Sequence, residues 1–256
     1  MVPELKENER IDDLERNGYR IIQNRSRFCF GMDAVLLSGF AWEGEGCIIS
    51  NKMRIADLGT GTGIIPLLLH GRMGTTDEHR EFIYGIEIQP EMAEMAQRSV
   101  MLNGLSDEIK IMCADLRVCA DMLGRDSFDI VTSNPPYMKS GSGLINPDDS
   151  RALSRHEINC TFDDVAHQAS LLLKKGGRFY LVHRPERLTE LFGTMQKHHL
   201  EPKRMKMVHS FIDSQAAMVL IEARKGGGAY LKVEKPLIIY KEKGVYTDEI
   251  RQIYGY

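Results

Sequence analysis

A glycine-rich segment, DLGTGTG at residues 57–63, places three glycines at alternate positions: Gly59, Gly61 and Gly63. Glycine lets the backbone approach a ligand closely, and the start of a following helix offers backbone N–H groups that have no partner within the helix. A phosphate-binding loop would need Lys followed by Ser or Thr, and a dinucleotide-binding loop would need glycine where this chain has Ile64. The segment therefore predicts a loop for a different cofactor. The alternative is a tight turn that binds nothing.

The sequence Asn134-Pro135-Pro136-Tyr137 is the second chemical signal. Consecutive prolines cannot donate hydrogen bonds to a sheet, so simple strand termination is one interpretation. The other concerns an amino group conjugated to an aromatic ring or carbonyl, which is a weak nucleophile because its lone pair is delocalised. The Asn134 side-chain oxygen and the Pro135 carbonyl would accept both N–H bonds and turn the lone pair toward an electrophile held at the glycine loop, while Tyr137 would stack on the target ring. No separate general base is needed, because the nitrogen loses its proton after transfer and positioning dominates the rate.

Two carboxylates follow predicted strands. Glu87 closes the segment FIYGIEI, and Asp115 comes just after IKIMC. A carboxylate at the end of a strand can accept hydrogen bonds from both hydroxyls of a ribose. Either acid alone would be an ordinary solvated residue, but their register with the glycine loop favours a shared nucleoside site.

The elements that must position these residues alternate along the chain from residue 54 onward. This alternation predicts an α/β fold in which helices cover both faces of a mostly parallel sheet, with ligands beyond the carboxyl ends of its strands. The predicted strands are residues 54–58, 82–88, 109–113, 128–132, 178–182, 203–208 and 218–223, and the predicted helices begin at Ile64 and Pro90 or cover 162–173 and 187–198.

We expect one domain over residues 1–256. Residues 1–50 should form a hairpin, with its turn at 23–26, and then a helix from Asp33; residues 51–225 should form the cofactor-binding and catalytic core, and 226–256 a C-terminal extension with a strand in 230–240. Residues 138–160 have no pattern, and loops of that length in compact domains are usually functional or mobile.

The composition excludes several classes of protein. The chain has 256 residues, a net charge of −3, 43% hydrophobic and 27% charged residues, which is typical of a folded globular domain. Its five cysteines form no CxxC pair, so neither a disulfide framework nor a metal cluster is expected and the simplest location is the cytoplasm. No signal peptide or membrane span is expected. Both a monomer and a homodimer are compatible with these figures.

The charge is divided unevenly. Residues 1–150 hold 15 Lys and Arg against 24 Asp and Glu, whereas residues 151–256 hold 18 against 12. A basic half indicates contact with a polyanion, and the alternative is scattered solvated charge. The candidate residues for contact with this polyanion are Arg20, Arg25 and Arg27 in the hairpin, Lys139, Arg151 and Arg155 in the long loop, and Lys203, Arg204 and Lys206 in the basic half.

The glycine loop resembles motif I of class I S-adenosylmethionine-dependent methyltransferases, and NPPY resembles the motif of enzymes that methylate planar nitrogen. Across nearly the whole chain the sequence is similar to the family of tRNA1(Val) adenine-N6 methyltransferases. The shared segments are residues 13–23, 28–37, 57–63, 85–105, 134–137, 176–179 and 184–188. Met32 departs from the family, which commonly has Thr there.

The resemblance implies a Rossmann-like class I fold with a seven-stranded sheet, S-adenosylmethionine as cofactor and tRNA as partner. It implies that Glu87 binds the cofactor ribose and Asp115 its adenine. The catalytic residues would be Asn134, Pro135, Pro136 and Tyr137, and the cofactor would contact Phe30, Asp33, Asp57, Gly59, Thr60, Gly61, Gly63, Glu87, Ile88, Asp115, Leu116 and Asn134.

The implied reaction is methylation of an adenine N6 beside the anticodon. Alternatives are another nucleic-acid adenine N6 methyltransferase, or a glutamine N5 methyltransferase acting on release factors. The latter usually has a longer helical domain ahead of its cofactor loop, whereas 56 residues precede Asp57 here. A non-catalytic RNA-binding module is a third interpretation, but it does not explain why the glycine loop, both acids and NPPY occur together.

Overall fold

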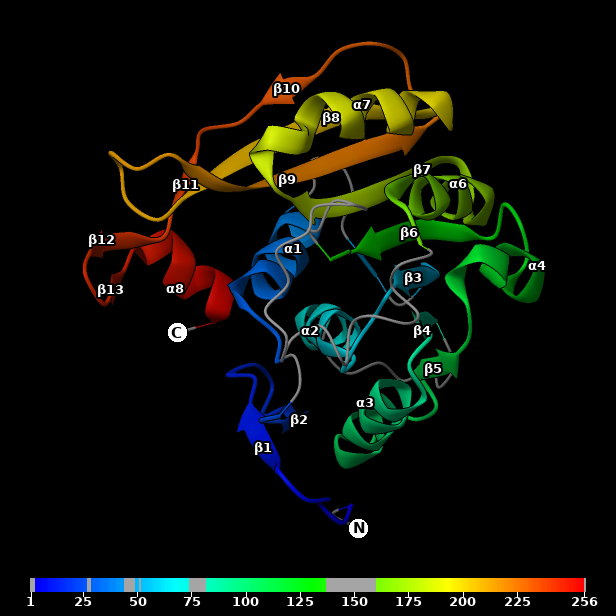
Figure 1. Ribbon diagram of the computed structural model, residues 1–256, viewed down its shortest axis with the longest axis vertical. Helices are drawn as coiled ribbons and strands as arrows, with labels where there is room; N and C mark the ends of the chain where they lie inside the picture. Colours follow the sequence, from blue (N-terminus) through cyan, green and yellow to red (C-terminus); the bar gives the residue numbers. More distant parts are fainter. Residues whose placement is uncertain are drawn as a thin grey trace.

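The computed structural model describes residues 3–26, 29–43, 49–50, 52–73, 82–136 and 160–255. Within them a nine-stranded sheet crosses the molecule in the order β10-β8-β9-β7-β6-β3-β4-β5, with β11 also paired to β8 (Figure 1). Neighbours from β7 to β5 are parallel, and β9 is antiparallel to β7 and β8. The strands are β3 (Ile55–Leu58), β4 (Ile83–Glu87), β5 (Ile109–Cys113), β6 (Phe128–Ser133), β7 (Leu173–His183), β8 (Leu200–His209), β9 (Ala216–Lys225), β10 (Lys232–Val233) and β11 (Leu237–Ile238).

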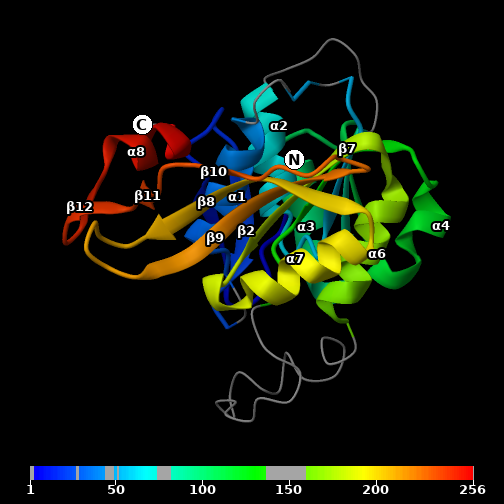
Figure 2. The same cartoon turned by 90° about the horizontal axis from the view of Figure 1, so that it is seen from above.

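Helices cover both faces of the sheet, as Figures 1 and 2 show from two directions. Successive strand residues point to opposite faces, so neighbours in the sequence join different apolar clusters. Ile55 and Ile130 pack with α1, α2 and α3, whereas Ala56 and Val131 pack with α4, α6 and α7. The helices are α1 (Met32–Trp42), α2 (Ile64–Met73), α3 (Pro90–Leu102), α4 (Cys119–Leu123), α6 (Phe162–Leu172) and α7 (Leu188–Lys197), with 3₁₀ turns η1 (Leu116–Val118) and η3 (Pro185–Arg187).

Helix boundaries follow local chemistry. Pro90 occupies the first turn of α3, where its missing N–H costs nothing, and Gly104, with φ +72°, follows its last turn. Thr161 and Asp164 form a reciprocal capping box at the start of α6. This helix ends at Leu172, earlier than predicted, because β7 already begins at Leu173.

The predicted α/β fold with a mostly parallel sheet is confirmed. The seven predicted strands are present, and two further strands of two residues each, β10 and β11, extend the edge at β8. The single strand expected within 230–240 is thus divided in two.

The N-terminal hairpin is present, but the predicted position of its turn was wrong. It pairs β1 (Glu9–Asp13) with β2 (Arg20–Asn24), and its turn lies between them rather than at 23–26. The charged sequence of β1, ERIDD, carries no β-strand signature. Its partner β2 provides the buried Ile21 and Ile22. The packing of β2 in the core therefore fixes that strand, and β1 becomes a strand by pairing with it.

The C-terminal extension forms a small hairpin and a helix: β12 (Tyr240–Glu242), β13 (Val245–Tyr246) and α8 (Asp248–Tyr254). Helix α8 packs beside α1, where Ile253 lies against Gly39. It also meets the N-terminal turn, because Arg16 Nη2 donates to the Ile253 carbonyl at 2.9 Å. The C-terminal helix α8 therefore contacts the turn between β1 and β2.

Candidate functional site

The glycine loop joins β3 to α2, and its three glycines have different structural roles. Gly59, Gly61 and Gly63 all have positive φ, at +76°, +58° and +83°. A Cβ atom placed on Gly59 or Gly61 would meet nothing within 4 Å, whereas one on Gly63 would lie 3.2 Å from the Ala96 Cβ of α3. The first two glycines thus border open space, and the third permits close helix packing.

Glu87, at the carboxyl end of β4, fixes this loop. Its Oε2 accepts a hydrogen bond from the backbone N–H of Gly61 at 2.9 Å, and its Oε1 accepts one from Gln89 at 2.9 Å. Burial raises the pKa of Glu87, and these backbone hydrogen bonds act in the opposite direction. The carboxylate lies at the strand end where the sequence placed a ribose-binding acid.

Asp57 is fully buried beneath the loop. Its Oδ1 accepts a hydrogen bond from Thr132 Oγ1 at 2.7 Å, and burial raises its pKa to about 6. Asp57 Oδ2 and Thr60 Oγ1 are both buried, and hydrogen bonding from the Thr132 and Thr60 side chains lowers the pKa of Asp57 against the effect of burial. Asp57 therefore supports the loop from below and does not line the pocket described next.

A small pocket of about 50 Å³ lies above the loop. It brings together Phe30, the glycine loop and Asn134, which come from three separate parts of the chain. Its lining residues are Phe30, Ala34, Gly59, Thr60, Gly61, Thr62, Ile64, Ile65 and Asn134. Asp33 lies in the first turn of α1 next to this lining, where its Oδ1 accepts the Ala34 N–H at 2.9 Å.

Asp115 follows β5 and is not part of that lining. Its carboxylate accepts hydrogen bonds from the Arg117 side chain, which lower its pKa, and from the Arg117 backbone. Ile88 and Leu116, after β4 and β5, are half-buried. These three residues lie at the ends of neighbouring parallel strands, where a nucleoside could extend from the pocket.

The segment Asn134 to Pro136 leaves the sheet directly after β6. Asn134 and Pro135 are half-buried and Pro136 is exposed. Ser133 Oγ donates to the Leu58 carbonyl at 2.9 Å, which ties the end of β6 to the end of β3. Tyr137 lies outside the described residues.

The candidate RNA-binding residues separate into groups. Arg20 and Arg25 are exposed on the N-terminal hairpin. The predictions for Arg27, Lys139, Arg151 and Arg155 lie outside the described residues. Lys203 is half-buried; it donates to the Gly228 carbonyl at 2.9 Å, and its ammonium lies 5.8 Å from the centre of the Tyr230 ring.

The structure corrects the predictions for Arg204 and Lys206, because neither side chain presents a free charge to RNA. The guanidinium of Arg204 is buried 3.9 Å from the centre of the Phe40 ring and donates to Glu222 at 2.9 Å. The ammonium of Lys206 lies 3.3 Å from carboxylates of both Glu234 and Glu249. The two residues are two positions apart in β8, so their side chains point to the same face of the sheet and both reach Glu234.

Sequence reasoning missed two polar residues near the site. Thr132 holds Asp57, and its signal was a hydroxyl within an otherwise apolar parallel strand. His183 ends β7 beside β6, and its signal was a titratable residue closing the apolar run RFYLVH. Its Nδ1 accepts the Arg184 N–H at 2.7 Å, and burial, aided by the charge of Arg187, lowers its pKa to about 4.

The described residues hold neither a metal cluster nor a helix that could span a membrane. They contain no group of three or more His, Cys, Asp or Glu side chains that could hold a metal ion. In the same part of the chain, no helix has the length and apolar character needed to cross a membrane.

Comparison with known proteins shows which family this chain resembles. Residues 49–232 match the family model described as a methyltransferase domain. The chain is 32% identical over 223 residues to the tRNA1(Val) (adenine(37)-N6)-methyltransferase of Porphyromonas gingivalis, covering 86% of this chain and 84% of that protein. The protein of the same name from Pedobacter heparinus is 24% identical over 231 residues, covering 90% and 91%.

Solved structures show the same fold. A predicted O-methyltransferase from Agrobacterium tumefaciens aligns with a TM-score of 0.66 at 24% identity, covering 87% of this chain and 95% of that one. The 16S rRNA N2 G1207 methyltransferase of Thermus thermophilus, solved with AdoMet and guanosine, aligns with a TM-score of 0.57 at 20% identity, covering 87% and 52%.

Proposed function

Because this chain belongs to the family of tRNA1(Val) (adenine(37)-N6)-methyltransferases, we propose that its site methylates N6 of an adenine beside the anticodon of a tRNA. The chain is an S-adenosylmethionine-dependent methyltransferase of class I fold. We place the reaction in the cytoplasm because its substrate is tRNA.

The observation that carries the proposal is the shared pocket of Asn134 and the glycine loop. A methyl transferase for a planar amino group needs hydrogen-bond acceptors for that group directly beside its cofactor. Asn134 and Pro135 emerge from β6, and the loop emerges from the adjacent parallel strand β3. The pairing of these two strands therefore supports a site where donor and acceptor meet.

The residues present fit the cofactor. Open space beside Gly59 and Gly61 would receive it, and the Glu87 carboxylate would accept hydrogen bonds from its ribose. Phe30 supplies an apolar wall. S-adenosylmethionine, when bound, supplies an electrophilic methyl group.

The chain itself contributes orientation and polarity. The Asn134 side-chain oxygen and the Pro135 carbonyl accept the two N6 hydrogens, which directs the nitrogen lone pair out of conjugation with the ring. Tyr137 stacks on the adenine. The same acceptors stabilise the positive charge that develops on nitrogen, and the proton leaves afterward to water.

The test is direct. The purified chain, S-adenosylmethionine with a deuterated methyl group and an unmodified tRNA transcript should yield deuterated N6-methyladenosine by nucleoside mass spectrometry. Nuclease fragments should place the label beside the anticodon. A strain that lacks the gene should lose this nucleoside from its tRNA and regain it on complementation.

Two controls give the result its meaning. The Asn134→Ala variant should bind the cofactor but yield little product. A release-factor peptide with its glutamine should remain unlabelled. Label in the peptide and none in tRNA would overturn the proposal in favour of glutamine N5 methylation.

A further inference from the structure

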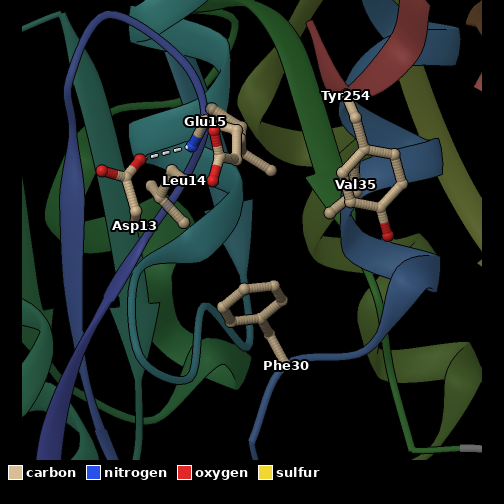
Figure 3. Close-up of a pocket in the computed structure, with 7 residues that line it drawn as sticks. Asp13, Leu14, Glu15, Phe30, Val35 and Tyr254 are labelled. Atoms are coloured by element: carbon tan, nitrogen blue, oxygen red, sulfur yellow. Dashed lines mark hydrogen bonds between the residues drawn. The ribbon is translucent and has the colours of Figure 1, made fainter. Parts of the chain in front are cut away.

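A larger open cavity of about 410 Å³ lies beside the cofactor pocket (Figure 3). This volume falls within the range of small-molecule sites, roughly 300–1,000 Å³. It shares Phe30 with the smaller pocket, so the two spaces meet at one aromatic ring. Its lining residues are Asp13, Leu14, Glu15, Phe30, Val35, Leu68 and Tyr254.

The cavity is built almost entirely by additions to the methyltransferase domain. The family model covers residues 49–232, and of the lining only Leu68 falls within them. Such a domain supplies the cofactor site. Chemistry specific to the substrate is therefore expected where the added segments meet.

Several contacts hold the walls together across the length of the chain. Arg16 Nη2 and Arg72 Nη2 both donate to the Ile253 carbonyl of α8, at 2.9 and 2.7 Å. Asn17 Nδ2 donates to the Gly71 carbonyl of α2 at 2.8 Å. The N-terminal turn, α2 and α8 are thereby fixed around the cavity.

The turn adopts an unusual backbone to form its wall. Glu15 has φ +53°, a left-handed conformation that non-glycine residues adopt rarely and at a cost. Its backbone N–H donates to Asp13 Oδ1 at 2.7 Å, which is drawn as a dashed line in Figure 3. Both carboxylates are exposed at the rim, whereas Leu14, Val35 and Leu68 form a buried apolar floor.

Two aromatic rings enter this space from different elements. Figure 3 shows Phe30, ahead of α1, and Tyr254, on α8, projecting toward the same cavity. Tyr254 is held by stacking on Tyr246 with ring centroids 5.8 Å apart, and Tyr246 stacks on Tyr240 at 5.2 Å. The ring thus belongs to a row of three stacked tyrosines.

This combination selects the chemistry of the occupant. Acidic groups at the rim repel a phosphate, so the cavity does not suit the backbone of a nucleic acid. Aromatic walls suit a flat ring, and carboxylates accept hydrogen bonds from exocyclic amino groups of bases.

We propose that the cavity receives a second base of the substrate RNA, an amino-bearing base near the methylated adenine. It stacks against Tyr254 while its amino group donates to Glu15 or Asp13. This proposal rests on the proposed function and names a second point at which the same RNA is held. Holding a neighbouring base would turn the target adenine toward Asn134.

The experiment pairs protein variants with abasic RNA. Full-length tRNA is assembled by ligation with a single abasic nucleotide at each anticodon-loop position other than the target. In the wild-type protein, one position should lower kcat/KM by about 5- to 100-fold, the range expected for loss of one stacked base. The Tyr254→Ala variant should show the same loss of kcat/KM with intact tRNA. The abasic site at that position should then lower its kcat/KM little further.

Matched variants separate this role from a structural one. Tyr254→Phe keeps the ring and should retain the response to the abasic site. Cofactor affinity by calorimetry should be the same in all variants. If Tyr254→Ala lowers the unfolding midpoint, Glu15→Ala at the exposed rim replaces it, because it removes the acceptor, and its abasic response at the same position should shrink.

The outcomes are distinguishable from failure of the proposed function. If the wild-type protein methylates no tRNA, the proposed function fails. If it methylates tRNA, and the losses from Tyr254→Ala and from every abasic site simply multiply, no base enters the cavity and the present inference is wrong.

Discussion

The backbone N–H of Gly61 donates to Glu87 Oε2 at 2.9 Å, so the ends of β3 and β4 are joined at the cofactor loop. The two residues come from adjacent parallel strands, where Leu58 pairs with Ile86. Glu87 is buried and remains oriented by the Gln89 N–H as well. The loop is therefore held in a left-handed conformation by the carboxylate that we propose binds the ribose, which reduces the ordering needed on binding.

Replacing Gly61 should harm cofactor binding more than folding. Gly61→Ala places a methyl group in open space at φ +58°, so the cost to stability should be about 1 kcal/mol from the backbone alone. The same methyl group enters the volume assigned to the cofactor, and affinity by calorimetry should fall by roughly tenfold or more.

Gly104 offers the matched control. It has φ +72° and equally open surroundings, but it follows α3 far from the loop in sequence. Gly104→Ala should lose similar stability in urea unfolding and bind the cofactor normally. Equal cofactor affinities for the two variants would contradict the assignment of Gly61.

Asn134→Ala should slow methyl transfer without a comparable loss of cofactor affinity. The substitution removes one acceptor for the target amino group, and loss of such a hydrogen bond commonly costs about 100- to 1,000-fold in rate. Asn134→Asp keeps an acceptor oxygen, so its rate should lie between those of the wild type and Asn134→Ala. Single-turnover rates on tRNA at saturating cofactor provide the measurement, and near wild-type turnover for Asn134→Ala would refute the role.

Much of this site could be predicted from the sequence because it depends on local signals. The glycine loop, Glu87 and Asn134 each follow an apolar strand directly, and parallel strands bring their carboxyl ends to one edge. The cavity beside it could not be predicted, since Glu15 and Tyr254 meet only through tertiary contacts of the two chain ends.

The wrong predictions have the same physical origin. β1 was missed because its charged sequence becomes a strand only by pairing with β2. The sequence does not reveal that Glu222 and the Phe40 ring lie beside Arg204, and for that reason the prediction of Arg204 as an RNA contact is wrong. Tertiary partners decide such cases, and local patterns do not contain them.

Asp57 should make the protein without cofactor less stable as pH rises. Burial raises its folded pKa to about 6, above the ordinary 3.8, so the folded state binds a proton more tightly than the unfolded chain does. The stabilisation is present below about pH 4 and lost as pH rises through about 6, with a size on the order of 2–3 kcal/mol. In urea unfolding, the difference in unfolding free energy between wild type and Asp57→Asn should change with pH across this range, and parallel curves would contradict the assignment.

His183 should act in the opposite direction over an overlapping range. Its folded pKa is lowered to about 4 from 6.5 by burial and by Arg187, so the unfolded chain binds the proton more tightly. Its contribution is present above about pH 6.5 and lost as pH falls toward 4. The difference in unfolding free energy between wild type and His183→Asn should therefore change with pH in the sense opposite to that of Asp57→Asn, and a change in the same sense would show that another group is responsible.

RNA binding should depend steeply on salt, and the segment after NPPY should account for part of that slope. A chain with net charge −3 must gather positive groups locally to hold tRNA, and Lys139, Arg151 and Arg155 adjoin the catalytic motif in the sequence. Each contacted phosphate releases condensed counterions, so replacing all three cations should weaken tRNA binding and reduce the salt slope by about 1 to 3. Cofactor affinity should not change.

The control for that experiment uses cations at the opposite end of the sheet. Arg125, Lys174 and Lys225 pair with Asp121, Asp129 and Asp126, at the ends of strands remote from Asn134. Replacing these three removes the same charge without touching the site. Gel-shift titrations across a salt series should give this control variant the slope of the parent protein. The variant of Lys139, Arg151 and Arg155 should give a shallower slope, because only those three cations contact phosphate. Equal slopes for all three proteins would show that RNA is bound elsewhere, and Arg20 and Arg25 on the exposed hairpin would be the next cations to replace.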